Sequence, residues 1–267
     1  MNIKIVTALL FLFLSFGNGG FAIDQLFWSW LFRYFHVVAG VMWIGLLYYF
    51  NFVQVPALAD ALADEGGPGP AAIGKYVAPR ALLWFRMAAA ATWVTGAWAL
   101  SISPQYGFIN TFLFQAPAGA MMSLGAWMGT IMLFNVWVLI WPNQKIVIGI
   151  KDGDAAAAGP KAALASRTNT LLSVGMLYFM VASAHYPASG QVLGANLEMP
   201  ALLTGLAIIF AIEANAIWGK MLPAITSVRS VIVSSFVLCI VLSSVCLLYT
   251  SDAADDTPCV DLGGRRI

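Results

Sequence analysis

The stretch His36-Val-Val-Ala-Gly-Val-Met-Trp-Ile-Gly-Leu-Leu-Tyr-Tyr-Phe-Asn51 decides the fold, because it belongs to a run between Arg33 and Asp60 without Asp, Glu, Lys or Arg. An apolar run of about 20 residues can cross a bilayer as a helix. Of the 267 residues, 61% are hydrophobic and 9% are charged, whereas soluble domains carry about 25% charged residues. A β-barrel would need short alternating strands, so the sequence predicts an all-α, polytopic transmembrane helical bundle.

Further apolar runs complete the predicted bundle. Six spans are expected at residues 27–57, 78–101, 117–141, 168–186, 200–218 and 230–249, within a transmembrane domain of residues 23–244. Residues 1–22 have a short apolar core behind Lys4 and end in small residues, which is typical of a signal peptide, or they form a seventh, N-terminal anchor span. Helix ends are expected beside prolines, where a missing N–H costs least; these are Pro104, Pro117, Pro142, Pro187 and Pro200.

Basic residues are confined to alternate connections between the predicted spans. They lie within residues 60–80, 142–167 and 219–229, and the connections 102–116 and 187–199 hold none. The positive-inside rule therefore places the three basic connections in the cytoplasm. We expect a multi-pass protein of a bacterial inner membrane, in contact with the lipid bilayer. The net charge of +1 gives no reason to expect a nucleic-acid partner.

The two histidines are candidate ligands for a redox centre. His36 in the first span and His185 in the last turn of the fourth are both expected in the outer half of the bundle. Gly40 and Trp43 share the helical face of His36, and a glycine there leaves room for a flat ring. Neutral imidazole is a usual axial ligand of haem iron, so both histidines are predicted to bind one iron. The alternatives are copper or another metal, or hydrogen bonds between helices; Arg33 either pairs with a haem propionate or snorkels to the interface.

Polar side chains form a second cluster at the inner ends of the predicted spans. They are Asn51, Gln54, Arg86, Asn135 and Glu213. A charge exposed to lipid costs at least about 2.5–3.5 kcal/mol, so these side chains are expected to face the bundle interior. One interpretation is a structural Arg86–Glu213 ion pair with amide hydrogen bonds around it. The other is a pocket in which Arg86 and Gln54 hold a planar, anionic, amide-rich molecule by forked hydrogen bonds.

Four segments carry a family resemblance. The longest is Phe35-His-Val-Val-Ala-Gly-Val-Met-Trp-Ile-Gly-Leu-Leu-Tyr-Tyr-Phe-Asn-Phe-Val-Gln-Val-Pro56. The others are Trp84-Phe-Arg86, Trp141-Pro-Asn-Gln-Lys-Ile-Val-Ile-Gly149 and Ser183-Ala-His-Tyr-Pro187. Together they resemble the bacterial membrane-bound urate hydroxylase family, also called the urate oxidase N-terminal domain. The resemblance extends over residues 27–245.

The resemblance implies a membrane-bound, haem-linked oxidoreductase that hydroxylates urate to 5-hydroxyisourate and passes the electrons to a cytochrome c. It makes His36 and His185 ligands of a haem b, and it makes Asn51, Gln54 and Arg86 substrate-side residues. It identifies no catalytic residue. The family carries a C-terminal cytochrome c domain, but this chain has no C-x-x-C-H motif for covalent haem. A separate cytochrome c or another electron acceptor is therefore the expected partner.

Two alternative functions remain open at this point. A b-type haem electron-transfer protein, or a membrane protein like the protoporphyrinogen oxidases, would share the histidine on an early helix without urate activity. A small-molecule transporter would use Arg86 and Glu213 on its substrate path, although the internal repeat of many transporters is not evident. Residues 245–267 resemble translated sequencing-adapter sequence, and we expect them to be a non-native tail outside the fold.

Overall fold

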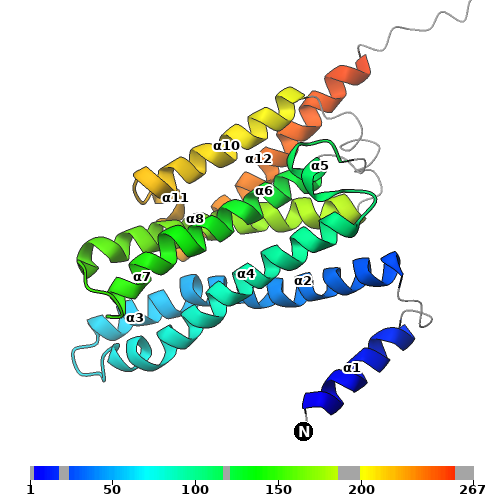
Figure 1. Ribbon diagram of the computed structural model, residues 1–267. Helices are drawn as coiled ribbons and strands as arrows, with labels where there is room; N and C mark the ends of the chain where they lie inside the picture. Colours follow the sequence, from blue (N-terminus) through cyan, green and yellow to red (C-terminus); the bar gives the residue numbers. More distant parts are fainter. Residues whose placement is uncertain (1–2, 18–23, 117–120, 186–198, 256–267) are drawn as a thin grey trace, which may run out of the picture.

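The computed structural model describes residues 3–17, 24–116, 121–185 and 199–255, and every regular element in these ranges is a helix (Figure 1). The α-helices are α1 (Ile3–Gly17), α2 (Gln25–Tyr48), α3 (Val55–Ala63), α4 (Ala78–Ile102), α5 (Phe108–Phe112), α6 (Met121–Phe134), α7 (Trp141–Val147), α8 (Ala155–His185), α10 (Met199–Trp218), α11 (Pro223–Thr226) and α12 (Val228–Asp255). Three π-helical segments are η1 (Tyr49–Gln54), η2 (Ile73–Val77) and η3 (Asn135–Ile140). The predicted all-α class is confirmed.

The long helices follow the predicted spans. Four of those in the described ranges are long and apolar enough to cross a membrane, namely Gln25–Ala63, Met121–Val147, Ala201–Trp218 and Val228–Val245. Helices α4 and α8 are long enough but are not among these four, so the count of six spans is not confirmed. Residues 18–22, Pro117, Pro187 and residues 256–267 lie outside the described part of the chain, and the signal peptide or anchor stays a prediction.

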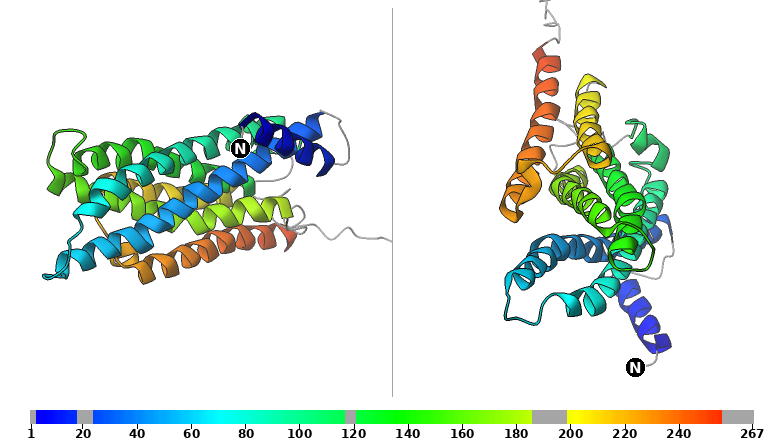
Figure 2. Two further views of the ribbon diagram at one scale, coloured as in Figure 1. Left: turned by 90° about the horizontal axis from the view of Figure 1, so that it is seen from below. Right: turned by 90° about the vertical axis from the view of Figure 1, so that its left-hand side faces the viewer.

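The long helices of the bundle run side by side (Figure 2). Helix α2 packs along α4, and α8 packs along both α6 and α12. Two hydrogen bonds tie helix ends together: Gln25 Nε2 donates to the main-chain oxygen of Ile102 at 2.7 Å, and the Tyr106 hydroxyl donates to that of Ser183 at 3.1 Å. These contacts gather the start of α2 and the ends of α4 and α8 at one end of the bundle, which we call the α5 end. Helices α3 and α7 lie at the opposite end, the α7 end (Figure 1).

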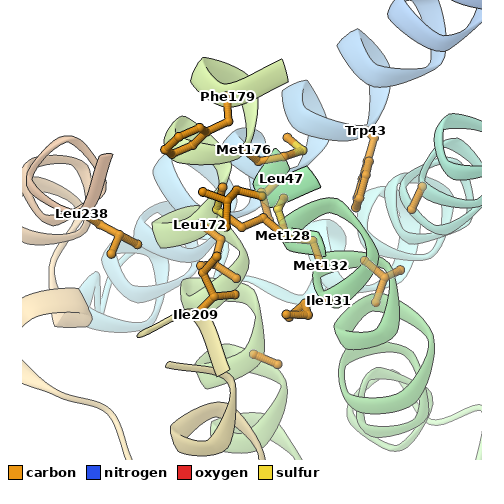
Figure 3. Close-up of a cluster of buried hydrophobic side chains, with 14 of the residues drawn as sticks. Trp43, Leu47, Met128, Ile131, Met132, Leu172, Met176, Phe179, Ile209 and Leu238 are labelled. Carbon is orange, nitrogen blue, oxygen red and sulfur yellow. The ribbon is translucent and has the colours of Figure 1, made fainter. Parts of the chain in front are cut away.

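Large apolar side chains fill the interior between α2, α6, α8 and α10. Among those with almost no exposed surface are Trp43, Leu47, Met128, Met132, Leu172 and Ile209 (Figure 3). The backbones of α6 and α8 also approach closely at Gly125 of α6. A Cβ added there would lie 2.7 Å from Met180 Cγ and 3.2 Å from the main-chain oxygen of Met176. Small residues allow such close approach of helices in membranes. The packing therefore fixes α6 against α8.

Each π-helical segment ends two residues before a proline. The prolines are Pro56 after η1, Pro79 after η2 and Pro142 after η3. A proline lacks the N–H of a helical hydrogen bond, and its ring clashes with the carbonyl four residues earlier. We infer that the wider π turn relieves this clash while the helix continues.

The expectation that Pro142 marks a helix end is therefore wrong. Helices α6 and α7 form one continuous helix with η3, from Met121 to Val147. In the same way the first predicted span, expected to end at residue 57, continues through Pro56 to Ala63. Pro104 does follow the end of α4, as predicted. The sequence indicated the positions of the helices but not the π turns inside them.

Candidate ligand pocket

A cavity of about 550 Å³ lies at the α7 end of the bundle. Its walls come from α3, α4, α7 and α8 and from all three π-helical segments. The π segments contribute Asn51 and Gln54 of η1, Lys75 of η2 and Ile140 of η3. Ligand pockets commonly measure about 300–1,000 Å³, and π turns are frequent at functional sites. The proline-associated turns thus meet around one cavity of ligand size.

Two buried polar atoms at this cavity lack a hydrogen-bond partner. Gln54 is 7% exposed and its Oε1 accepts no hydrogen bond, while Arg167 is 8% exposed and its Nη1 donates none. Buried polar groups are nearly always hydrogen-bonded, and a charged group left without a partner is costly. The lining therefore includes an amide and a guanidinium whose hydrogen-bonding capacity the protein does not use fully.

The charge of the pocket is positive. Arg167 lies within it, Lys75 is exposed on its rim, and no Asp or Glu occurs among the lining residues that the structure describes. Asn51 is committed to the protein, because its Nδ2 donates at 2.9 Å both to the main-chain oxygen of Leu47 and to Ser166 Oγ. An anion is thus the ligand class that the electrostatics favour.

The remaining walls are apolar and include two aromatic rings. Phe50 and Phe85 pack edge to face with ring centroids 5.5 Å apart and an interplanar angle of 80°. Leu82 and Val147 extend this surface, and the amide of Gln144 is a further polar group on the lining. Apolar walls with a few placed polar groups are usual for small-molecule sites. The pocket suits a flat, partly apolar anion.

Three of the five predicted substrate residues lie elsewhere. The guanidinium carbon of Arg86 is 3.8 Å from the centroid of the Trp141 ring, a cation–π contact between α4 and α7. Glu213 accepts a hydrogen bond from Asn135 Nδ2 at 2.9 Å, and the same nitrogen donates to Asn169 Oδ1 at 2.9 Å. In the described structure no Arg86–Glu213 ion pair forms, and only Asn51 and Gln54 of the predicted set line the cavity.

His36 is half buried between α2 and α4. Its Nδ1 lies 2.7 Å from the main-chain oxygen of Thr92. Because a carbonyl oxygen only accepts, Nδ1 carries the proton and Nε2 is the nitrogen left to bind a metal. A Cβ added at Gly96 would lie 2.7 Å from the ring carbon Cε1, so the imidazole rests against the main chain of α4. Metal-binding histidines are commonly held by such a bond to a carbonyl.

The other predicted cofactor residues do not gather around His36. A Cβ at Gly40 would meet the Thr92 side chain at 3.7 Å, so α4 already occupies that space. Trp43 is 2% exposed in the apolar core, with its Nε1 unpartnered, and Arg33 is exposed. The described residues contain no cluster of three His, Cys, Asp or Glu side chains that could hold a metal ion.

The two histidines occupy different places on their helices. His185 is the exposed last residue of α8, at the α5 end. His36 follows Gln25, which lies at the same end, by eleven residues, or about 16 Å of helix at about 1.5 Å per residue. Their joint ligation of one iron stays a prediction.

Sequence reasoning missed several pocket residues, and Arg167 is the most important of them. It was assigned to a basic connection because polar residues surround it, whereas the structure places it inside α8. Lys75, Gln144 and Ser166 also line the pocket, and none of them is among the predicted site residues. The signal that could have found Arg167 is its spacing, since Thr170 and Ser173 follow it at intervals of three residues, as on one face of a helix.

The fold and the pocket define an all-helical protein with membrane-compatible helices and a buried cationic site for a flat anion. A family model described as Urate oxidase N-terminal matches residues 102–241. The match covers more than half of the chain, so the chain belongs to this family, which indicates an oxidoreductase of the urate type. The matched range includes η3, α7 and α8. No curated protein and no solved structure matches the chain.

Proposed function

We propose that the chain is a membrane-bound oxidoreductase that binds urate in the pocket at the α7 end and oxidises it to 5-hydroxyisourate. The observation that carries the proposal is the pair of polar side chains that line the cavity, Gln54 and Arg167, each of which has a buried atom without a hydrogen-bond partner, Oε1 and Nη1 respectively. Family membership supports the choice of urate among flat anions.

The chemistry of urate complements these two groups. Urate is a planar monoanion at neutral pH, with ring N–H groups and carbonyl oxygens alternating around its edge. The guanidinium of Arg167 can donate to a carbonyl or deprotonated edge, where charge-assisted hydrogen bonds are strong. Gln54 Oε1 can accept from a ring N–H, and the Phe50 and Phe85 rings supply apolar contact with the purine. Lys75 on the rim adds a second positive charge that attracts the anion.

The reaction requires a destination for electrons. Urate and one water molecule give 5-hydroxyisourate, two protons and two electrons. We propose that the electrons leave through a separate cytochrome c or another acceptor. No described residue near the cavity is assigned as the catalytic base.

We propose that His36 would hold a haem b. The bond between Nδ1 and the Thr92 carbonyl orients the imidazole and leaves Nε2 as the nitrogen that can bind a metal. A bound haem would supply one-electron transfer between substrate and acceptor. The Thr92 carbonyl would hold the imidazole in one tautomer, and Gly96, which has no side chain, would leave room for the ring against α4.

The proposed location is a bacterial inner membrane with the pocket on the cytoplasmic side. Lys75, Lys145, Lys151 and Lys161 all lie at or beside the α7 end, and basic connections remain cytoplasmic by the positive-inside rule. Urate would then enter from the cytoplasm, where purines are degraded, and electrons would move toward the α5 end.

The test uses the purified full chain with urate, a cytochrome c and, as the variant, Arg167→Gln. We expect loss of the urate absorbance and reduction of the acceptor, both abolished by Arg167→Gln. Arg229→Gln is the matched control, because Arg229 is exposed and lies outside the pocket. Urate that binds without oxidation would indicate a carrier or transporter. A protein that neither binds nor oxidises urate would refute the proposal.

A further inference from the structure

The side chains of Asn135, Asn169 and Glu213 form a polar cluster inside the bundle, separate from the pocket. They come from the start of η3, from α8 and from α10. Asn135 and Asn169 have no exposed surface, and Glu213 is 6% exposed. Asn169 is anchored by a hydrogen bond from its Nδ2 to the main-chain oxygen of Met132 at 2.9 Å. The cluster is therefore a fixed arrangement in a dry environment.

The hydrogen bonds of this cluster leave two acceptors without a donor. Asn135 Nδ2 uses its two hydrogens on Asn169 Oδ1 and Glu213 Oε2. Asn135 Oδ1 and Glu213 Oε1 are buried and have no partner. The Asn135 amide and the Glu213 carboxyl group, to which these two oxygens belong, are already joined by the 2.9 Å hydrogen bond between Nδ2 and Oε2. One additional hydrogen between the two remaining oxygens would complete the network.

We propose that Glu213 is a proton-binding site, a neutral carboxylic acid whose hydroxyl donates to Asn135 Oδ1. An acid and an amide then form a cyclic pair with two hydrogen bonds, and neither unpartnered oxygen remains. An ionised carboxylate would be a buried charge, and in the described structure no Lys, Arg or His forms an ion pair with Glu213. Such a charge costs much more than a satisfied neutral pair.

A monovalent cation is the competing occupant of the cluster. Four side-chain oxygens lie in it, but Asn135 Nδ2 directs its hydrogens at two of them, Glu213 Oε2 and Asn169 Oδ1. A cation coordinated by the remaining two would have few ligands and a positive amide edge beside it. A proton needs only those two oxygens, so the geometry favours the proton.

The first test is an infrared spectrum of the full chain in lipid nanodiscs. We expect the carbonyl stretch of a protonated carboxyl group, which disappears in Glu213→Gln and shifts to higher frequency in Asn135→Leu, because both hydrogen bonds between the acid and Asn135 are lost. Absence of this band in the wild-type protein at neutral pH overturns the proposal.

The second test is stability, and it requires no urate, so it is independent of the proposed function. In Glu213→Gln the new glutamine amide can replace the acid. Its nitrogen donates to Asn135 Oδ1, and its oxygen accepts from Asn135 Nδ2. The melting temperature should therefore stay close to that of the wild type, whereas Glu213→Ala should lower it by about 5 °C or more. Failure of Glu213→Gln to fold, or a sodium-dependent rise of the wild-type melting temperature that this variant loses, would contradict the proposal.

Discussion

Asn51 donates a hydrogen bond from Nδ2 to Ser166 Oγ at 2.9 Å, and this contact joins η1 to α8 across the wall of the pocket. The Asn51 nitrogen also bonds to the main-chain oxygen of Leu47. The position of η1 is thereby fixed relative to α8, which carries Arg167. Gln54 of η1 and Arg167 of α8, the two lining residues with unpartnered buried atoms, are consequently held in place by a bond that needs no ligand.

Loss of the Asn51–Ser166 contact should weaken binding without removing a ligand contact. Ser166→Ala deletes the acceptor, and a neutral hydrogen bond contributes about 0.5–1.5 kcal/mol. We expect urate affinity to fall about 2- to 10-fold, measured by isothermal titration calorimetry. Ser234→Ala is the control, because Ser234 lies outside the pocket lining and its hydroxyl bonds to the main chain of Ala224. Unchanged affinity in Ser166→Ala would show that this contact does not shape the site.

Two substitutions of Gln54 test separately its role as a hydrogen-bond acceptor and its lack of negative charge. Gln54→Leu removes the acceptor for a ring N–H, and we expect about a 10-fold loss of urate affinity. Gln54→Glu keeps an acceptor but places a negative charge beside the anion, so the loss should be larger still. Equilibrium dialysis with urate measures both. The same changes at Gln115, which is exposed after α5, should have no effect, and equal losses for the two Gln54 variants would contradict an anionic ligand.

Pro142→Ala tests the link between the π turns and the pocket. Alanine restores the missing N–H and removes the ring clash, so η3 can relax to an α-helix. We expect a melting temperature equal to or above that of the wild type together with weaker urate binding, because Ile140 moves from the lining. Pro104→Ala, beyond the end of α4, is the control. A variant with unaltered affinity would mean that the π geometry of η3 is not needed by the site.

The location of the helices could be predicted from sequence, but the neighbours of their side chains could not. Runs without charge indicated the long helices because lipid allows no unpaired backbone. Arg86 and Glu213 both had to face the interior, yet their partners depend on helix rotation, and Arg86 meets Trp141 while Glu213 meets Asn135. The π turns escaped prediction because a proline is compatible with either a helix end or a widened turn. Arg167 was missed for a related reason, since a cation near a loop and a cation inside a helix look alike in sequence.

Gly96→Ala tests the packing of His36 on α4. The added Cβ would lie 2.7 Å from His36 Cε1 and 2.8 Å from Nδ1, so the ring must move and its bond to the Thr92 carbonyl is lost. Overpacking of this kind costs about 1–3 kcal/mol, measured as a fall in thermal stability. Gly45→Ala is the matched control on the neighbouring helix, because nothing lies within 4 Å of its added Cβ, and alanine favours a helix over glycine. The double variant with His36→Ala should recover part of the loss; purely additive losses would refute the contact.

We expect substitutions of the two histidines to have different effects on the visible spectrum of the purified protein. His36 has one nitrogen fixed by a carbonyl and the other left to bind a metal, whereas His185 is exposed at the end of α8. If a haem b is bound through His36, His36→Ala should abolish the reduced-minus-oxidised haem bands and His185→Ala should leave them unchanged. Loss of the bands in both variants would support the paired ligation that the sequence predicts. Bands that survive His36→Ala would remove His36 from the redox site, because the tautomer fixed by Thr92 would then serve only to hold α2 against α4.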